Sequence, residues 1–159
     1  EWREAATGGL YAGLAYALLT IAAHAGRSMP GLVTILNAVS FFSFAGFLYF
    51  YARRMAAYAG GDGFSYGRSL LFVLKMSLFA GVLAGVGQFV LVANMAGGGM
   101  GEKEAEMAGS LGLKLMRNPL FAVFSGIFSM LIYGGLLGLL ISIFVRRPAD
   151  PFGGGTSAE

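Results

Sequence analysis

Four long apolar segments dominate this sequence and leave it few folds to adopt. They cover residues 5–25, 31–52, 69–96 and 119–145, and Lys75 is the one charged residue within them. About 20 consecutive apolar residues cross the hydrocarbon core of a bilayer as a helix. Lipid offers the backbone no hydrogen-bond partners, and the segments do not alternate as barrel strands do. We therefore expect an all-α polytopic membrane protein with four transmembrane helices in an up-down bundle.

The composition agrees with one membrane domain. The chain is 57% hydrophobic and 12% charged, whereas soluble domains are about 25% charged. We expect a four-helix domain over residues 1–147 and a flexible, glycine- and proline-rich tail over residues 148–159. The chain has no cysteine and one histidine, which excludes thiolate sites and paired-histidine haem or zinc sites. We expect no metal and no cofactor.

The connection between the third and fourth segments contains an amphipathic stretch. Residues 102–117 combine charged residues with leucine and methionine. This pattern is typical of a helix that lies in the membrane interface. An extension of the third helix beyond the membrane fits the pattern equally well, and both interpretations stay open.

Basic residues near the ends of the segments predict the orientation of the chain. Four spans place both termini and the connection between the second and third spans on one side. That side carries six basic residues: Arg3, Arg53, Arg54, Arg68, Arg146 and Arg147. The other side carries four: Arg27, Lys103, Lys114 and Arg117. Since cytoplasmic loops are enriched in lysine and arginine, we expect both termini in the cytoplasm. The basic residues lie in connections, not along one face, so we expect no nucleic-acid partner.

Small residues recur four positions apart on three of the predicted helices. The pairs are Gly9 and Gly13, Gly81 and Gly85, and Gly134 and Gly138. Residues at this spacing share one face of a helix, and small ones let two helix backbones approach closely. We expect these glycines to pack the helices of this unit together. A docking face for another protein is the alternative.

Few polar residues lie inside the predicted spans. A charge at the centre of a bilayer costs about 3 kcal/mol or more, but Lys75 lies about two turns after Arg68. We expect its ammonium group to snorkel to the cytoplasmic interface, with a proton or substrate role as the alternative. Asn37, Gln88 and Asn94 can form hydrogen bonds between helices. Gln88 lies deepest, and we expect Gln88 and Asn94 to be buried polar groups.

The connection before the third span combines a turn with polar and basic residues. Its glycines at positions 60, 61 and 63 interrupt the helix. Ser65 is placed to cap the third helix, and Tyr66 to anchor it at the headgroup level. We favour these structural roles. The functional alternative is contact with lipid headgroups or a cytoplasmic partner, by Arg53, Arg54, Ser65, Tyr66, Arg68 and Lys75.

Three short segments resemble a known family. They are residues 2–6 (WREAA), residues 64–69 (FSYGRS) and the charged connection at 102–116. Over nearly its whole length the chain is similar to the small bacterial membrane proteins grouped as domain of unknown function 4199. The resemblance implies four helices in the bacterial inner membrane. It implies no catalytic or cofactor-binding residues, because no activity is established for the family.

The sequence contains no recognisable catalytic constellation. No carboxylate lies inside a predicted span, and nucleophile-elbow, zinc-protease and phosphate-loop motifs are missing. An enzyme acting on lipids is therefore the least favoured function. We expect a non-catalytic accessory or scaffold subunit that contacts the lipid bilayer and other membrane protein subunits. The alternative is a small-solute or lipid transporter or channel that works as a homo-oligomer.

Overall fold

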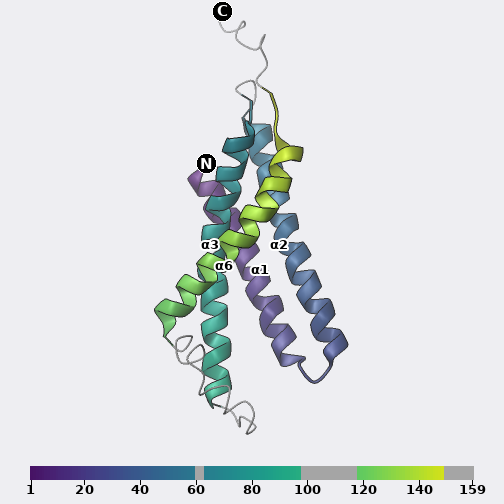
Figure 1. The fold of residues 1–159 in the computed structure, drawn as a ribbon, viewed down its shortest axis with the longest axis vertical. Helices are drawn as coiled ribbons and strands as arrows, with labels where there is room; N and C mark the ends of the chain where they lie inside the picture. Colours follow the sequence, from purple (N-terminus) through teal and green to yellow (C-terminus); the bar gives the residue numbers. More distant parts are fainter. Residues whose placement is uncertain (60–62, 98–117, 149–159) are drawn as a thin grey trace, which may run out of the picture.

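Four long helices make up the computed structural model, which describes residues 1–59, 63–97 and 118–148. They are α1 (Trp2–Ala25), α2 (Pro30–Tyr58), α3 (Tyr66–Gly97) and α6 (Pro119–Val145). Consecutive helices run in opposite directions along the long axis of the molecule (Figure 1). Each is long and apolar enough to cross a membrane. The prediction of an all-α, four-helix membrane bundle is confirmed.

Three helices are longer than the apolar segments that predicted them. Helix α1 begins at Trp2 instead of residue 5, α2 continues past residue 52 to Tyr58, and α3 begins at Tyr66 instead of residue 69. An apolar segment ends where lipid contact ends, but a helix continues as long as its backbone groups find partners four residues away. The expected helix at 102–117 and most of the expected tail at 148–159 lie outside the described residues.

Local signals in the sequence account for the helix boundaries. Pro30 occupies the first turn of α2, where a missing N–H group leaves no hydrogen bond unmade. Pro119 does the same for α6, and the Oδ1 atom of Asn118 accepts a hydrogen bond from the Leu120 N–H group at 3.0 Å. A side chain that satisfies a free N–H group in this way stabilises the start of a helix.

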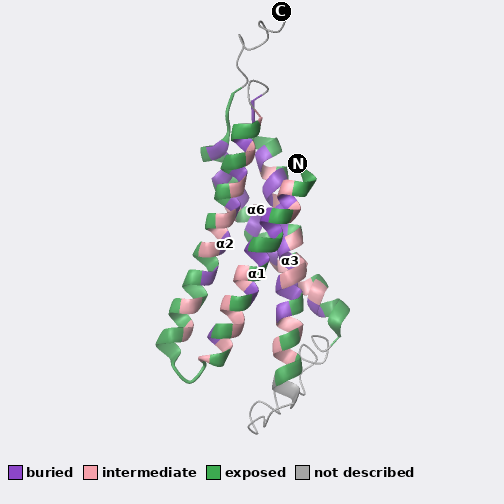
Figure 2. Cartoon of the chain, turned by 180° about the vertical axis from the view of Figure 1, so that it is seen from behind, coloured by how far each residue is buried: buried purple, intermediate pink, exposed green. Residues whose placement is uncertain are grey.

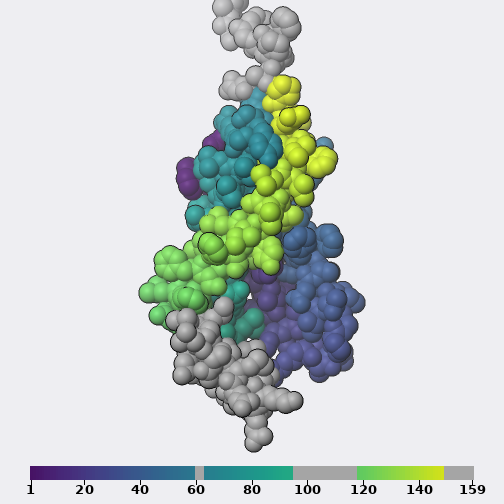
Figure 3. Space-filling model, in the orientation of Figure 1, coloured from purple at the N-terminus to yellow at the C-terminus, as the bar shows by residue number. Residues whose placement is uncertain are grey.

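Helix α3 lies at the centre of the bundle. It packs most extensively against α6 and next against α1, whereas α2 packs mainly against α1. Figure 3 shows α6 running diagonally across this face of the molecule, close to α2 at its C-terminal end and away from α2 at its N-terminal end. The two long contacts of α3 therefore hold the bundle together, and α2 is the peripheral helix.

Glycines let the backbones of α1 and α6 lie very close to the backbone of α3. A Cβ atom added to Gly13 would lie 2.7 Å from the Ala80 Cα atom, and one added to Gly85 would lie 2.5 Å from the Val123 Cα atom. No real side chain fits at such distances, so only glycine is compatible with these contacts. The small residues thus set how closely α1 and α6 approach α3.

Buried side chains are concentrated toward the end of the bundle where α3 begins. Figure 2 shows most of the buried residues in that half, whereas the opposite half of α2 is largely exposed. Phe44, Leu48 and Met76 are among the largest fully buried side chains. In a membrane, the large exposed apolar side chains of all four helices contact lipid.

Candidate functional site at the arginine end

The end of the bundle where α3 begins gathers basic residues from three separate elements. We call it the arginine end and define it by Arg53, Arg54, Arg68, Arg146 and Arg147. The first two lie near the C-terminus of α2, Arg68 lies in the first turn of α3, and the last two follow α6 directly. The up-down topology brings these segments together although they are distant in sequence.

A short backbone pairing closes this end of the molecule. The N–H group of Phe64 donates to the Arg147 carbonyl oxygen, and the N–H group of Arg147 donates to the Phe64 carbonyl oxygen, both at 2.9 Å. Gly63 precedes the pairing with a φ of 71°, a conformation that favours glycine. The Phe64 side chain is fully buried beneath the pairing. The second residue after α6 is therefore held against the segment that leads into α3.

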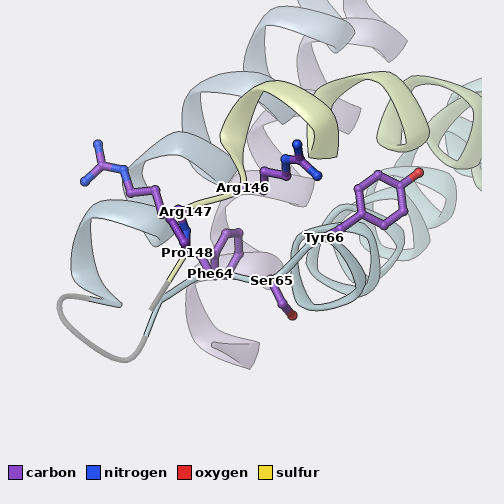
Figure 4. Close-up of a pocket in the computed structure, with 6 residues that line it drawn as sticks. All are labelled: Phe64, Ser65, Tyr66, Arg146, Arg147 and Pro148. Atoms are coloured by element: carbon purple, nitrogen blue, oxygen red, sulfur yellow. The ribbon is translucent and has the colours of Figure 1, made fainter. Parts of the chain in front are cut away.

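Ser65 and Tyr66 have mainly structural contacts. The Oγ atom of Ser65 accepts a hydrogen bond from the Arg68 N–H group at 3.3 Å, which is the cap that the sequence predicted. The phenol of Tyr66 donates to the Leu139 carbonyl oxygen of α6 at 3.4 Å. Both residues also line a cavity of about 340 Å³ beside Phe64. In Figure 4 the Arg146 side chain points toward the Tyr66 side of this cavity, whereas Arg147 points away.

A second cavity, between α2 and α6, is lined by three of the arginines. It measures about 260 Å³, and its lining includes Arg53, Arg146 and Arg147. Among the residues that the structure describes, none of the three forms an ion pair with a carboxylate. Clustered guanidinium groups with free donors match the oxygens of a phosphate or carboxylate. This cavity can hold an anionic group, such as the phosphate of a lipid headgroup.

Arg68 does not line this cavity and instead contacts Glu1. Its Nε atom lies 2.6 Å from the Glu1 Oε1 atom. The ammonium group of Lys75 lies 3.9 Å from the other Glu1 oxygen and 4.5 Å from the centre of the Trp2 ring. One carboxylate at the start of α1 thus neutralises two cations of α3. Lys75 is directed toward the arginine end, as expected of a snorkelling side chain.

The hydrogen bond from Arg68 also changes the acidity of Glu1. It stabilises the charged carboxylate and holds the pKa of Glu1 below its usual value. Partial burial opposes this effect, and the positive charges of Arg68 and Lys75 reinforce it. Glu1 therefore stays ionised at physiological pH and keeps its contact with α3.

Arg54 is the remaining predicted arginine, and it lies apart from the cavities. Its guanidinium group donates to the Tyr58 phenol oxygen at 3.2 and 3.3 Å, one turn further along α2. The four basic residues of the predicted headgroup contacts thus divide into three groups: Arg53 in the cavity between α2 and α6, Arg54 on Tyr58, and Arg68 with Lys75 on Glu1. Arg146 and Arg147 were missing from the predicted set. Their position directly after a span was the available signal.

The two polar residues expected to be buried lie elsewhere on α3. Asn94 is exposed, and its side-chain amide donates to the Val90 carbonyl oxygen of the same helix at 2.9 Å. Its predicted burial is wrong, because this end of α3 extends beyond the well-packed half of the bundle. Gln88 is half-buried. Its buried Oε1 atom has no hydrogen-bond partner among the described residues, so the structure contains no interhelical bond to that atom.

The six predicted packing glycines all lie at helix contacts. Gly9 and Gly13 face the backbone of α3, and Gly81 and Gly85 face the backbone of α6. Gly134 and Gly138 face side chains of α3, namely Ser77, Leu70 and Val73. Gly126 of α6, which faces both Gly81 and Gly85, was not predicted. Its spacing of four from Ala122 was the available signal.

The described residues contain no group of three or more histidine, cysteine, aspartate or glutamate side chains placed to hold a metal ion. No protein-family model, curated protein or solved structure matches the chain. The described residues of the arginine end form a cationic surface at one end of a helical membrane bundle.

Proposed function

We propose that this chain is a non-catalytic accessory or scaffold subunit of a larger membrane protein complex. The observation that carries the proposal is the exposure of the first ten residues of α2. No residue from Pro30 to Val39 is buried in the structure, and the two that are partly buried, Val33 and Leu36, lie on one side of the helix. The other sides of these turns are exposed, so α2 has room there for a helix of another subunit.

The arginine end complements this role. In our proposal it lies at the cytoplasmic face of a bacterial inner membrane, where Arg53, Arg146 and Arg147 bind the phosphates of anionic lipids. The resemblance to the family called domain of unknown function 4199 supports the same location. Binding at the cytoplasmic interface would fix the depth and orientation of the bundle and leave α2 presented to its partner.

Site-specific cross-linking tests the proposal. A photoreactive amino acid replaces Ile35 of α2, whose side chain is 62% exposed, and in a control variant Leu136 of α6, which is 61% exposed. Both tagged variants are irradiated in their own membranes, purified in mild detergent and sized by native mass spectrometry. We expect a stoichiometric cross-link to one larger membrane protein from position 35 and none from position 136.

Two other results would contradict the proposal. Equal, diffuse products from both positions would mean that α2 faces lipid alone. A cross-link between two copies of this chain, with no other protein, would favour the alternative function, a small-solute or lipid transporter or channel working as a homo-oligomer. Solute or lipid flux into liposomes would then be measured.

A further inference from the structure

A small cavity lies between α1, α2 and α6 at the point where α6 diverges from α2. It measures about 190 Å³ and is lined by Tyr16, Asn37, Ser40, Phe41, Phe44, Met130 and Tyr133. The middle of α6 passes close to α2 in this region, and the N-terminal part of α6 leans away from α2 (Figure 3). The cavity is separate from the arginine end, and of its lining only Asn37 belongs to the exposed turns of α2.

The floor of this cavity contains a polar group without a partner. Ser40 is 2% exposed, and its Oγ atom has no hydrogen-bond partner among the described residues. The buried Ser77 differs, because its Oγ atom donates to the Val73 carbonyl oxygen at 2.9 Å, whereas Ser69 and Ser142 share the lack of a partner among the described residues. A buried hydroxyl without a hydrogen bond is costly, and the cost disappears if a bound molecule supplies the missing partner.

Aromatic rings form the walls of the cavity. Tyr16 of α1 contacts Phe44 of α2 with ring centroids 6.2 Å apart, and Phe41 of α2 contacts Tyr133 of α6 with centroids 6.5 Å apart. Both pairs are packed edge to face, a geometry that aromatic rings prefer for one another. The lining also contains the amide of Asn37 but no charged side chain. The surroundings therefore suit a neutral ring that carries oxygen atoms.

The rim of the cavity opens toward lipid, far from either membrane surface. Phe41 and Tyr133 are 41% and 48% exposed, whereas Phe44 and Met130 on the floor are 1% and 2% exposed. Ser40 lies ten residues after the start of α2 and Met130 eleven residues after the start of α6, about 15 and 16 Å along each helix. The hydrocarbon core is about 30 Å thick, so a ligand would enter from the middle of the bilayer.

We propose that this cavity binds the oxygenated six-membered ring of a lipid-soluble molecule, of the quinone or quinol class, whose apolar tail remains in the bilayer. The volume suits one ring, since an apolar cavity of about 150 Å³ engineered in another protein holds benzene. The Ser40 hydroxyl and the Asn37 amide each donate and accept hydrogen bonds, so they pair with a ring carbonyl or a ring hydroxyl. The tail would leave between Phe41 and Tyr133.

Binding measurements in lipid nanodiscs test this proposal. The probes are a benzoquinone with a saturated alkyl tail, its quinol, and an alkylbenzene with the same tail but no ring oxygen. The variants are Ser40→Ala and the control Ser142→Ala, which removes another buried hydroxyl without a partner. Saturable binding is followed by native mass spectrometry and by the unfolding temperature.

We expect the wild-type chain to bind the quinone or the quinol saturably. Ser40→Ala should weaken that binding about 5- to 10-fold, the effect of losing one hydrogen bond, and leave binding of the alkylbenzene unchanged. Ser142→Ala should bind all three probes as the wild type does. A photoreactive quinone should label the peptides that contain residues 37–44 and 130–133.

Three results would overturn the proposal. Absence of saturable binding of both quinone and quinol would mean that the cavity holds only water. Equal losses in Ser40→Ala and Ser142→Ala would mean a general effect on the fold. Labelling spread over all four helices would mean that the probe dissolves in the lipid around the bundle.

Discussion

Glycine is irreplaceable at some contacts of this bundle and replaceable at other positions. A Cβ atom at Gly85 would meet the backbone of α6, which cannot move without shifting the helix. At Gly138 it would meet the ends of the Leu70 and Val73 side chains, at 3.0 and 3.1 Å, and these can adjust. At Gly46 nothing lies within 4 Å. The three positions therefore rank by what the added atom would displace.

This ranking predicts the stability of alanine variants. Gly85→Ala should lower the free energy of unfolding by about 1–3 kcal/mol, as overpacking does, and Gly138→Ala by less. Gly46→Ala should raise it by about 0.5–1 kcal/mol, because alanine favours an exposed helix more than glycine does. Detergent denaturation followed by circular dichroism measures all three. Equal stabilities of Gly85→Ala and Gly46→Ala would contradict the close approach of α3 and α6.

The contact between Glu1 and Arg68 predicts a dependence of stability on pH. A carboxylate whose pKa is lower in the folded state stabilises the fold above its unfolded pKa, about 4.3 for glutamate. That contribution is lost as pH falls through the lower folded pKa. The side chains are 45% and 33% exposed, so the contribution at neutral pH should stay below about 1 kcal/mol.

Thermal unfolding of the wild type and Glu1→Gln checks this expectation. The wild type should be slightly more stable at neutral pH, and the difference should shrink toward zero as pH falls below about 4. A difference of constant size across this range would show that the carboxylate charge contributes nothing and that Glu1 acts through packing alone.

At the scale of the elements, the C-terminal end of α2 places two neighbouring arginines in different surroundings. The C-terminus of α2 carries Arg53 into the cavity between α2 and α6, while Arg54, one residue later, turns to Tyr58. The pairing of Phe64 with Arg147 holds the end of α6 near Arg53. Two neighbouring arginines of one helix thus have different surroundings, because successive side chains point about 100° apart around the helix axis.

This difference predicts how each arginine contributes to lipid binding. In nanodiscs, Arg53→Gln and Arg147→Gln should each weaken retention of phosphatidylglycerol by about 1 kcal/mol, the contribution of one cation near an anionic surface. Arg54→Gln is the matched control and should have a smaller effect, because its guanidinium group is already bonded to Tyr58. Native mass spectrometry of retained lipids is the measurement. An equal loss in all three variants would indicate general surface charge instead of a site.

At the scale of the whole molecule, the described residues place a cluster of five arginines at one end of the bundle. The arginine end carries basic residues from α2, α3 and the segment after α6, and the start of α1 lies beside them. The turn that joins α1 and α2 lies at the opposite end (Figure 1). If the arginine end faces the cytoplasm, as we propose, residues at the two ends must be accessible from opposite sides of the membrane.

Cysteine labelling measures this orientation directly, because the chain contains no cysteine of its own. Met29 and Tyr58 are 62% and 64% exposed and lie at opposite ends of α2. A membrane-impermeant maleimide should label Met29→Cys only in right-side-out vesicles and Tyr58→Cys only in inside-out vesicles. The reverse pattern would place the arginine end outside the cytoplasm.

The sequence by itself determined the number of helices, their up-down order, the starts of α2 and α6, and the faces on which glycines lie. These properties are local: they depend on hydropathy over about 20 residues and on the chemistry of neighbouring residues. Even the capping role of Ser65 needs only the backbone three residues ahead. None of these features depends on which helix packs against which.

Only the tertiary structure decided which side chains meet. The contact of Glu1 with two cations of α3, the cluster of Arg53 with Arg146 and Arg147, and the cavity around Ser40 all join residues from different helices. Such contacts depend on the rotation, tilt and crossing of each helix, which the packing of whole surfaces sets. In an apolar span many faces have similar hydropathy, so the pattern of the sequence alone does not select the face that turns inward.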